Sequence, residues 1–425
     1  EYDGYLDRSR LPSVLLAEGS LYSKRFFTDI ERLIIFNNQE KKGNLFLGYQ
    51  FTHEYKKLEY NDPFTSGLFG IVPNGFTVSD QSRYIKNDNT IYLNSNFDKL
   101  GKINLRYTIT NFENNYKDYE LENDQYITGI KESQSNLQFG WKKDFNFFDF
   151  EIDINKSLSN DYISDYQSFN ISSDLTRDFN FKIGGIISKT SPNLNFILFR
   201  SIYEDYNWYN TDFENQTAKT INAHFGFKEL IKISAEYSIV DNYTFFRELT
   251  NALSDEIENF RRVKPEQIDS KINYYKIKLF SKIDFGKFSL LNTGQYQKKD
   301  QIIELDQLST LNVPEWITRN TIMFSSRVFN NSLFIQTGIT FNYFTKFYAD
   351  YYNPLLSEFV TQNYKEIGEY PRFDFFFNAK IQQTRVFIKV EHLNSSFTGY
   401  DFYSDPFNPY RDLSVRFGLV WNFFQ

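Results

Sequence analysis

The sequence contains no cysteine, and its 425 residues include only 10 prolines, 19 glycines and 3 histidines. The absence of cysteine excludes disulfide frameworks and thiolate metal sites. No apolar run approaches the length of about 18 residues that a membrane-spanning helix needs, and the mean hydropathy is −0.52. The net charge of −7 provides no basic excess, so nucleic acid is not an expected partner.

Aromatic residues are abundant instead, since 47 Phe, 31 Tyr and 4 Trp make up 19% of the chain. Many of them occur where apolar and polar residues alternate. The alternation is clear in segments 103–110, 148–155, 231–239 and 413–423, and looser in 333–341. A period of two places successive side chains on opposite faces of a β-sheet. No comparable stretch has a helical period, so the sequence predicts an all-β fold.

Connections of two lengths follow one another in the C-terminal half. Tight turns are predicted at 228–230, 284–286, 329–331 and 382–384. Longer polar loops are predicted near 241–270, 298–315, 348–371 and 396–411. Hairpins with short turns at one end and long loops at the other are typical of a transmembrane β-barrel. A water-soluble sandwich also alternates its faces, but it has no reason to gather its long loops at one end.

The number of amphipathic segments, about 16 to 18, favours the barrel over the sandwich. So many half-apolar strands would have to hide a very large apolar surface in water. A closed barrel leaves that surface to lipid and pairs every backbone group. We therefore predict a transmembrane antiparallel β-barrel over residues 41–425, with about 16 strands and with 14 or 18 left open. Residues 1–40 are predicted to be a lead-in or the first strand.

Charged side chains occur on the faces opposite the apolar ones. In a barrel these faces line the lumen. The candidate pore-lining residues are therefore Arg106, Lys142, Asp149, Glu151, Asp153, Lys232, Glu236 and Arg416. If neighbouring strands place them at one level, a positive strip lies beside a negative strip and tunes ion selectivity. Alternatively, the charges pair across strands and only stiffen the wall, because register cannot be read from sequence.

The end of the chain combines polar, glycine and aromatic residues at regular positions. Arg416, Gly418, Trp421 and Phe423 resemble the assembly signal of bacterial outer-membrane barrels, although the chain ends in Gln425 rather than in an aromatic residue. In such barrels the final strand pairs with an edge of the insertion machinery. The resemblance therefore implies that the barrel-insertion machinery is a partner during assembly.

The last hundred residues also resemble the putative porin family of Bacteroidetes. The similarity rests on Leu-Phe-Ile-Gln-Thr-Gly (333–338), Tyr-Asn-Pro (352–354), Ile-Gly-Glu-Tyr-Pro (367–371) with Asp374, Arg-Val-Phe-Ile-Lys (385–389) with Glu391-His392, and Arg-Phe-Gly (416–418) with Trp421. Upstream, Tyr-Asn-Trp-Tyr-Asn (206–210) is similar to a loop of the same family. The resemblance implies a barrel in the bacterial outer membrane and specifies no solute.

Catalytic and cofactor motifs are missing from the sequence. His53, His224 and His392 lie on separate predicted strands without the spacing of metal ligands. No nucleophile elbow, phosphate loop or dinucleotide fingerprint occurs. We therefore predict no catalytic, cofactor or metal site, and we expect that the protein is not an enzyme.

Together these observations predict an outer-membrane porin, surrounded by lipid, that passes small hydrophilic solutes by passive diffusion. The alternative is an accessory or structural barrel in a larger outer-membrane complex, with a lumen closed by the long loops. The loop at 206–209 and the loop after Tyr348 could contact other outer-membrane proteins or constrict a pore. A barrel enzyme is a third and weaker alternative.

Overall fold

The computed structural model describes residues 20–38, 43–63, 69–73, 75–118, 127–159, 161–249, 262–302, 309–398 and 402–421. Its main element is a 17-stranded antiparallel sheet in which each strand pairs with the next along the chain. The strands of this sheet are β1 (Ser20–Asn38), β2 (Gly43–Asp62), β3 (Val78–Phe97), β4 (Gly101–Tyr116), β5 (Gly129–Asp144), β6 (Asp149–Ser157), β7 (Ser164–Asp174), β8 (Phe179–Thr190), β11 (Gln216–Phe227), β12 (Ile231–Asp241), β15 (Ile272–Phe285), β16 (Phe288–Gln301), β17 (Trp316–Val328), β18 (Leu333–Phe344), β23 (Arg372–Ile381), β24 (Thr384–Glu391) and β25 (Ser414–Trp421).

Short hairpins and helical turns lie in the connections. The hairpins pair β9 (Leu198–Phe199) with β10 (Trp208–Tyr209), β13 (Thr244–Leu249) with β14 (Arg262–Gln267), β19 (Phe347–Tyr348) with β22 (Glu366–Ile367), and β20 (Tyr351–Asn353) with β21 (Glu358–Val360). The helical turns are α1 (Leu194–Ile197) and α2 (Ser395–Thr398). Among the described residues, no helix has the length and apolar character needed to cross a membrane.

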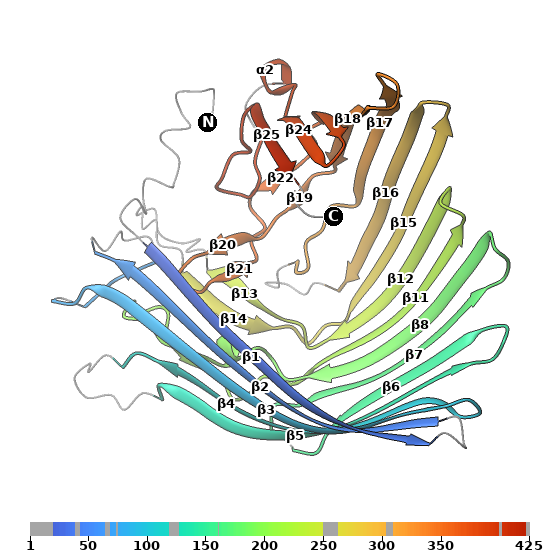
Figure 1. Ribbon diagram of the computed structural model, residues 1–425. Helices are drawn as coiled ribbons and strands as arrows, with labels where there is room; N and C mark the ends of the chain where they lie inside the picture. The colour runs from blue at the N-terminus through green and yellow to red at the C-terminus, as the bar shows by residue number, and fades with distance from the viewer. Residues whose placement is uncertain are drawn as a thin grey trace.

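The all-β prediction is confirmed, whereas the predicted count of 16 strands is not, because the described sheet has 17. Residues 20–38 form β1, which pairs with β2 along its whole length. In Figure 1 the sheet curves from β1 through β8 and β16 to β25, with β13, β14, β20 and β21 on its concave side. β1 and β25 are the two edges, and no pairing joins them among the described residues.

The connections within the sheet alternate in length from end to end. Connections of two to four residues join β1 to β2, β3 to β4, and so on to β23 and β24, while the intervening connections are longer. Because antiparallel neighbours reverse direction, all the short turns lie at one end of the sheet and all the long loops at the other. The predicted turn at 284–286 is displaced slightly, since β15 continues to Phe285 and the turn follows it.

The two faces of the sheet differ in polarity. Ile91, Tyr107 and Leu137 lie opposite one another on β3, β4 and β5, and they are 55%, 39% and 45% exposed. The other face is polar and packs against the loops, as where the Tyr203 hydroxyl donates to Asp62 at 3.0 Å. We call the polar face the inner face. The exposed apolar face is the surface that hydrocarbon would cover.

Gly101 provides a test of the β3–β4 turn and its register. It has a φ of +83°, and a Cβ there would collide with the backbone oxygen of Lys142 on β5. We expect Gly101→Ala to lower the free energy of unfolding by about 1–3 kcal/mol, measured by urea unfolding of the lipid-reconstituted protein. Gly294→Ala is the matched control, because its Cβ would meet nothing within 4 Å. Equal stabilities of the two variants would contradict this turn geometry.

Candidate functional site

The inner face carries all eight candidate pore-lining residues. Arg106 lies on β4 opposite Gln138, and its guanidinium carbon lies 5.0 Å from the centre of the Tyr92 ring. Lys142 on β5 lies directly opposite Glu151 on β6. Asp149 and Asp153 share the inner face of β6 with Glu151, and Lys232, Glu236 and Arg416 occupy the same face of β12 and β25.

The inner carboxylates of β6 lie outside the ion pairs of the sheet, although Lys142 is directly opposite Glu151. Asp153 accepts hydrogen bonds from the Tyr166 hydroxyl at 2.6 Å and from the Gln138 amide at 3.0 Å. Among the described residues, Asp149, Glu151 and Asp153 form no ion pair. These three carboxylates therefore form none of the cross-strand ion pairs of the alternative, although Asp153 is hydrogen-bonded to both neighbouring strands.

Ion pairs do form elsewhere on the inner face. Lys276 Nζ lies 2.9 Å from Glu236 Oε2, and an Arg416 guanidinium nitrogen lies 3.0 Å from Glu391 Oε2. Lys232 pairs at 2.9 Å with Glu229 in the turn before β12. On β12 and β25, cross-strand and local pairing thus accounts for part of the charge.

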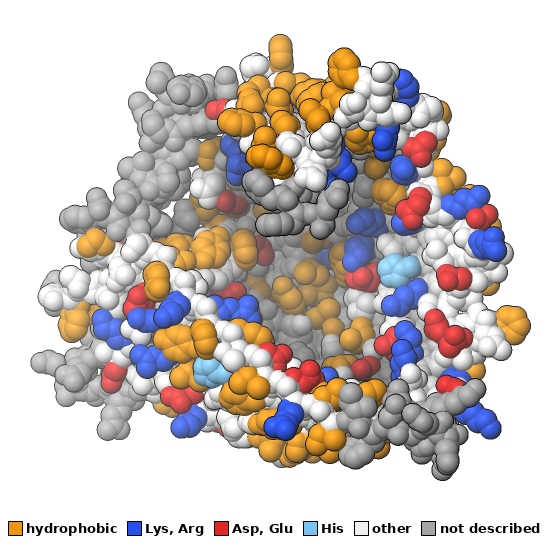
Figure 2. All heavy atoms as spheres, in the orientation of Figure 1, with side chains coloured by type: hydrophobic (Ala, Val, Ile, Leu, Met, Phe, Trp, Pro, Cys, Tyr) orange, Lys and Arg blue, Asp and Glu red, His pale blue; other side chains and the backbone are white. Residues whose placement is uncertain are grey.

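Charges of opposite sign are separated around the inner face. From β11 to β25 the described inner cations are Lys232, Lys276, Lys278, Lys282, Lys299, Arg319, Arg327, Arg372, Lys380, Arg385, Lys389 and Arg416, against the carboxylates Glu236, Asp284, Asp374 and Glu391. From β2 to β8 the described carboxylates are Glu54, Asp62, Asp80, Asp88, Glu132, Asp144, Asp149, Glu151, Asp153 and Asp174, against the cations Lys56, Lys86, Lys102, Arg106, Lys142 and Lys182. Figure 2 shows charged side chains of both signs around the central hollow. A solute in this hollow meets a basic wall and an acidic wall.

A second feature of the lumen is an apolar cluster formed by the long loops. We call residues 69–72, residues 194–208, the β13–β14 hairpin and residues 351–360 the loop cap. Tyr203, Tyr206 and Tyr351 in the cap are at most 1% exposed. The Phe69 ring lies edge-on to those of Tyr203 and Tyr206, with centres 5.7 and 5.8 Å apart. The cap packs on the inner face at the long-loop end, against the loop ends of β2, β4 and β5.

Two buried carboxylates of the wall hold the loop cap. Asp80 on β3 accepts hydrogen bonds from the Ser201 hydroxyl at 2.5 Å and from the Ile202 backbone N–H at 3.0 Å. Asp62 at the end of β2 accepts from the Tyr203 hydroxyl. Asp80 and Asp62 are 6% and 2% exposed. Because a buried carboxylate is costly without such donors, these contacts fix where the cap sits. Nothing in their local sequence distinguishes the two aspartates from other polar strand residues.

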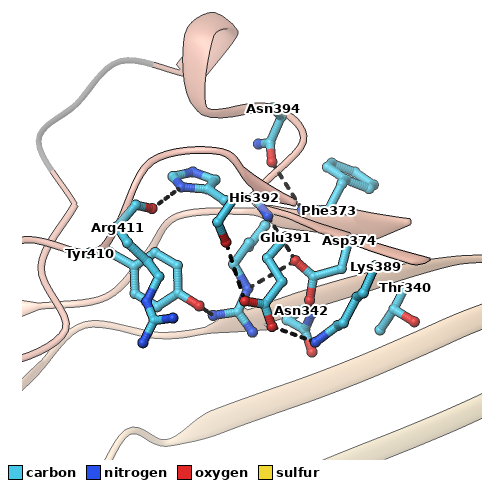
Figure 3. A network of polar contacts seen from close by, with 12 residues as sticks. Thr340, Asn342, Phe373, Asp374, Lys389, Glu391, His392, Asn394, Tyr410 and Arg411 are labelled. Atoms are coloured by element: carbon cyan, nitrogen blue, oxygen red, sulfur yellow. Dashed lines mark hydrogen bonds and ion pairs between the residues drawn. The ribbon is translucent and has the colours of Figure 1, made fainter. Parts of the chain in front are cut away.

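Asp374 organises a polar network where β23 and β24 meet the long loops (Figure 3). Its Oδ1 accepts from the backbone N–H of His392 at 3.0 Å and lies 3.6 Å from Nε of Arg372. His392 is 1% exposed, and its Nδ1 lies 2.9 Å from the carbonyl oxygen of Arg411. This histidine therefore shapes the connection after β24.

The other two histidines lie elsewhere on the sheet. His53 is on the outer face, with Nδ1 2.7 Å from Asn87 Oδ1, and His224 is on the inner face of β11 opposite Lys182. In the part of the chain that the structure describes, no three His, Asp or Glu side chains gather as a metal site.

The predicted assembly residues on the C-terminal strand lie on both faces of the sheet. Arg416 and Gly418 are on the inner face of β25, and a side chain at Gly418 would collide with the Phe387 ring. Trp421 is on the outer face and is 57% exposed. Phe423 lies outside the described residues. Their role in assembly stays a prediction.

An antiparallel sheet of this size, apolar outside and charged inside, defines an outer-membrane protein of the β-barrel class. Solved structures of bacterial outer-membrane proteins share its fold. The siderophore receptor PirA from Acinetobacter baumannii matches with a TM-score of 0.62 at 13% identity, over 95% of this chain and 62% of that one. The copper transporter OprC matches with a TM-score of 0.59 at 8% identity, over 89% and 64%. The chain thus spans less than two thirds of either protein, and the likeness is one of fold.

The chain belongs to the family described as putative porin, whose sequence model matches residues 5–425. The resemblance drawn from the C-terminal segments is confirmed, and it extends over nearly the whole chain. No curated protein matches the sequence. Family and fold assign the protein to the bacterial outer membrane, while the attribution to Bacteroidetes stays a prediction.

Removing the carboxylate of Asp80 should loosen the loop cap without unfolding the sheet. Asp80→Ala deletes the acceptor for Ser201 and Ile202, and hydrogen bonds to charged groups are worth about 1.5–3 kcal/mol each. We expect proteolytic cleavage within 194–208 to become at least tenfold faster. The sheet should stay folded, so the unheated protein should still migrate differently from the heated protein in gel electrophoresis. Glu151→Ala is the control, because Glu151 lies on the same face but makes no hydrogen bond to the cap. This variant should be cleaved at the rate of the parent protein. Unchanged proteolysis of the Asp80 variant would contradict the anchoring role.

Proposed function

We propose that the protein is an outer-membrane porin through which small hydrophilic solutes diffuse without energy coupling. The observation that carries this proposal is the polar, charged inner face behind an exposed apolar outer face. Such an inner wall is suited to water and polar solutes. In this proposal the sheet closes into a ring in the membrane, because unpaired edge groups of β1 and β25 would cost several kcal/mol each in lipid. We propose no catalytic activity.

The loop cap affects the expected conductance. It fills part of the lumen at the long-loop end with a core anchored by Asp62 and Asp80. We therefore expect small, stable conductance steps from the purified protein in a planar bilayer, and larger steps from Asp80→Ala. A protein that inserts but remains silent, in both forms, would oppose the porin proposal.

Selectivity follows from the separation of charge. A unit charge 7 Å from a permeating ion is worth about 0.6 kcal/mol in water, or roughly threefold in local ion concentration. The triple variant Asp149→Asn, Glu151→Gln and Asp153→Asn should have a cation-to-anion permeability ratio about threefold lower or more. The ratio is measured from the reversal potential in a salt gradient. Glu113→Gln, on the outer face of β4, is the control and should leave the ratio unchanged. An unshifted reversal potential in the triple variant would remove these carboxylates from the pore.

A second candidate is an accessory subunit of a larger outer-membrane complex, favoured by exposed aromatic residues on the loops. Tyr352 and Phe359 of the β20–β21 hairpin are 41% and 63% exposed, with ring centres 5.6 Å apart, and Phe397 on α2 is 87% exposed. Exposed aromatic groups of this kind mark interaction surfaces. This role would be favoured if the protein shows no conductance and co-purifies with defined partners in mild detergent. The Phe359→Ser variant should then lose those partners.

A further inference from the structure

A recess of about 700 Å³ lies between the inner wall and the loop cap. Its wall side comes from β1 to β5 together with β7 and β8, and it includes Lys56, Tyr84 and Gln134 beside the buried cluster. Its cap side includes Asn195 and Glu358. The volume is within the range of small-molecule binding sites.

The cations at the recess are already engaged by carboxylates. Lys86 Nζ lies 2.9 Å from Asp88 Oδ2. Glu54 Oε1 lies 2.7 Å from an Arg25 guanidinium nitrogen and 3.2 Å from Lys56 Nζ. An anionic ligand would have to compete with these carboxylates for the same cations, so anion binding is not favoured here.

The cap side of the recess also opposes an anion. Glu358 is at the start of β21, and its Oε1 accepts a hydrogen bond from the Asn195 amide at 3.0 Å. Burial raises the pKa of the Glu358 carboxyl above its ordinary value. A second negative charge beside this carboxyl would be repelled when Glu358 is ionised. The fourth lining cation, Lys57, is paired with Glu59. With Glu358 counted, four carboxylates in or beside the recess therefore balance its four cations.

The groups of the recess that remain available for hydrogen bonds to a ligand are neutral and polar. Tyr84, Gln134, Tyr162 and Thr190 line it, and within the described ranges their side chains make no hydrogen bond. The Gln134 amide offers two donors and one acceptor group, and each hydroxyl offers one donor and also accepts. These groups can therefore donate to and accept from the hydroxyls of a neutral solute.

Aromatic rings supply the apolar part of the surface. Tyr162 lies edge-on to Phe112 with ring centres 5.1 Å apart, and the Tyr84 ring lies 5.3 Å below the Lys56 ammonium. Rings of this kind pack against the C–H surface of a sugar ring, while amide and hydroxyl groups meet its hydroxyls.

We propose that this recess binds a neutral polyhydroxy solute, a mono- or disaccharide in size, before the solute enters the lumen. Balanced charges, unpartnered amide and hydroxyl groups, and aromatic side chains occur together at one place beneath the cap. The inference rests on the proposed porin function for its physiological meaning, but binding itself needs no open lumen.

Calorimetric titration tests the proposal with glucose, maltose and glucose 6-phosphate as probes. The purified full chain is held in a detergent without a sugar headgroup. We expect saturable binding of maltose or glucose, and weaker binding of glucose 6-phosphate than of glucose. The double variant Gln134→Ala with Tyr162→Phe should weaken sugar binding at least fivefold. Gln336→Ala, a glutamine on the inner face of β18 outside the recess, should bind like the parent.

Two results would overturn the recess as a sugar site. One is the absence of saturable heat from both sugars with folded protein. The other is tighter binding of glucose 6-phosphate than of glucose, which would assign the recess to anions. Conductance of the same preparation separates the two proposals. If the protein conducts but binds neither sugar, the porin proposal stands and the sugar site is excluded. If the protein is silent but binds sugar, the sugar site stands and the porin proposal is opposed.

Discussion

The register of the antiparallel sheet is the constraint on which everything else depends. Each strand separates two environments, so a slip of one residue would exchange its two faces. On β15, such a slip would move Lys276 and Lys278 from the inner face to the apolar outer face. A lysine facing lipid at the membrane midplane costs about 2–4 kcal/mol. The alternation of side chains therefore specifies the pairing of the strands and, through it, the composition of the inner wall.

The acidic half of that wall serves two purposes. Asp62 and Asp80, near the long loops, are buried and bonded to the loop cap. Asp149 and Glu151, near the short turns, have no ion-pair partner among the described residues and face the hollow. The same residue type thus anchors structure at one end of the strands and sets the electric field at the other. The difference comes from burial, because Asp62 and Asp80 are enclosed by donors of the loop cap, whereas Asp149 and Glu151 are not.

The loop cap fills part of the space on the inner side of the sheet. Its core gathers aromatic residues from loops that are far apart in the chain, and the polar recess lies where this core meets the wall. Similarity to the siderophore receptor and to the copper transporter extends to the fold of the sheet, at 13% identity or less. The shared fold therefore does not specify a solute, and the side chains of the cap and the wall determine which solutes can bind or pass.

The sequence by itself determined the features that repeat within one strand or one hairpin. A period of two identified β-structure and placed Arg106, Glu151 and Lys232 on the polar face, and short turns indicated the hairpins. The 17 strands, the opposition of Lys142 and Glu151, and the loop cap were decided only by the tertiary structure. Tyr203 and Asp62, for example, are 141 residues apart in the chain. Periodicity is a local property that any strand displays alone, whereas register between strands and packing between loops arise only when distant segments meet.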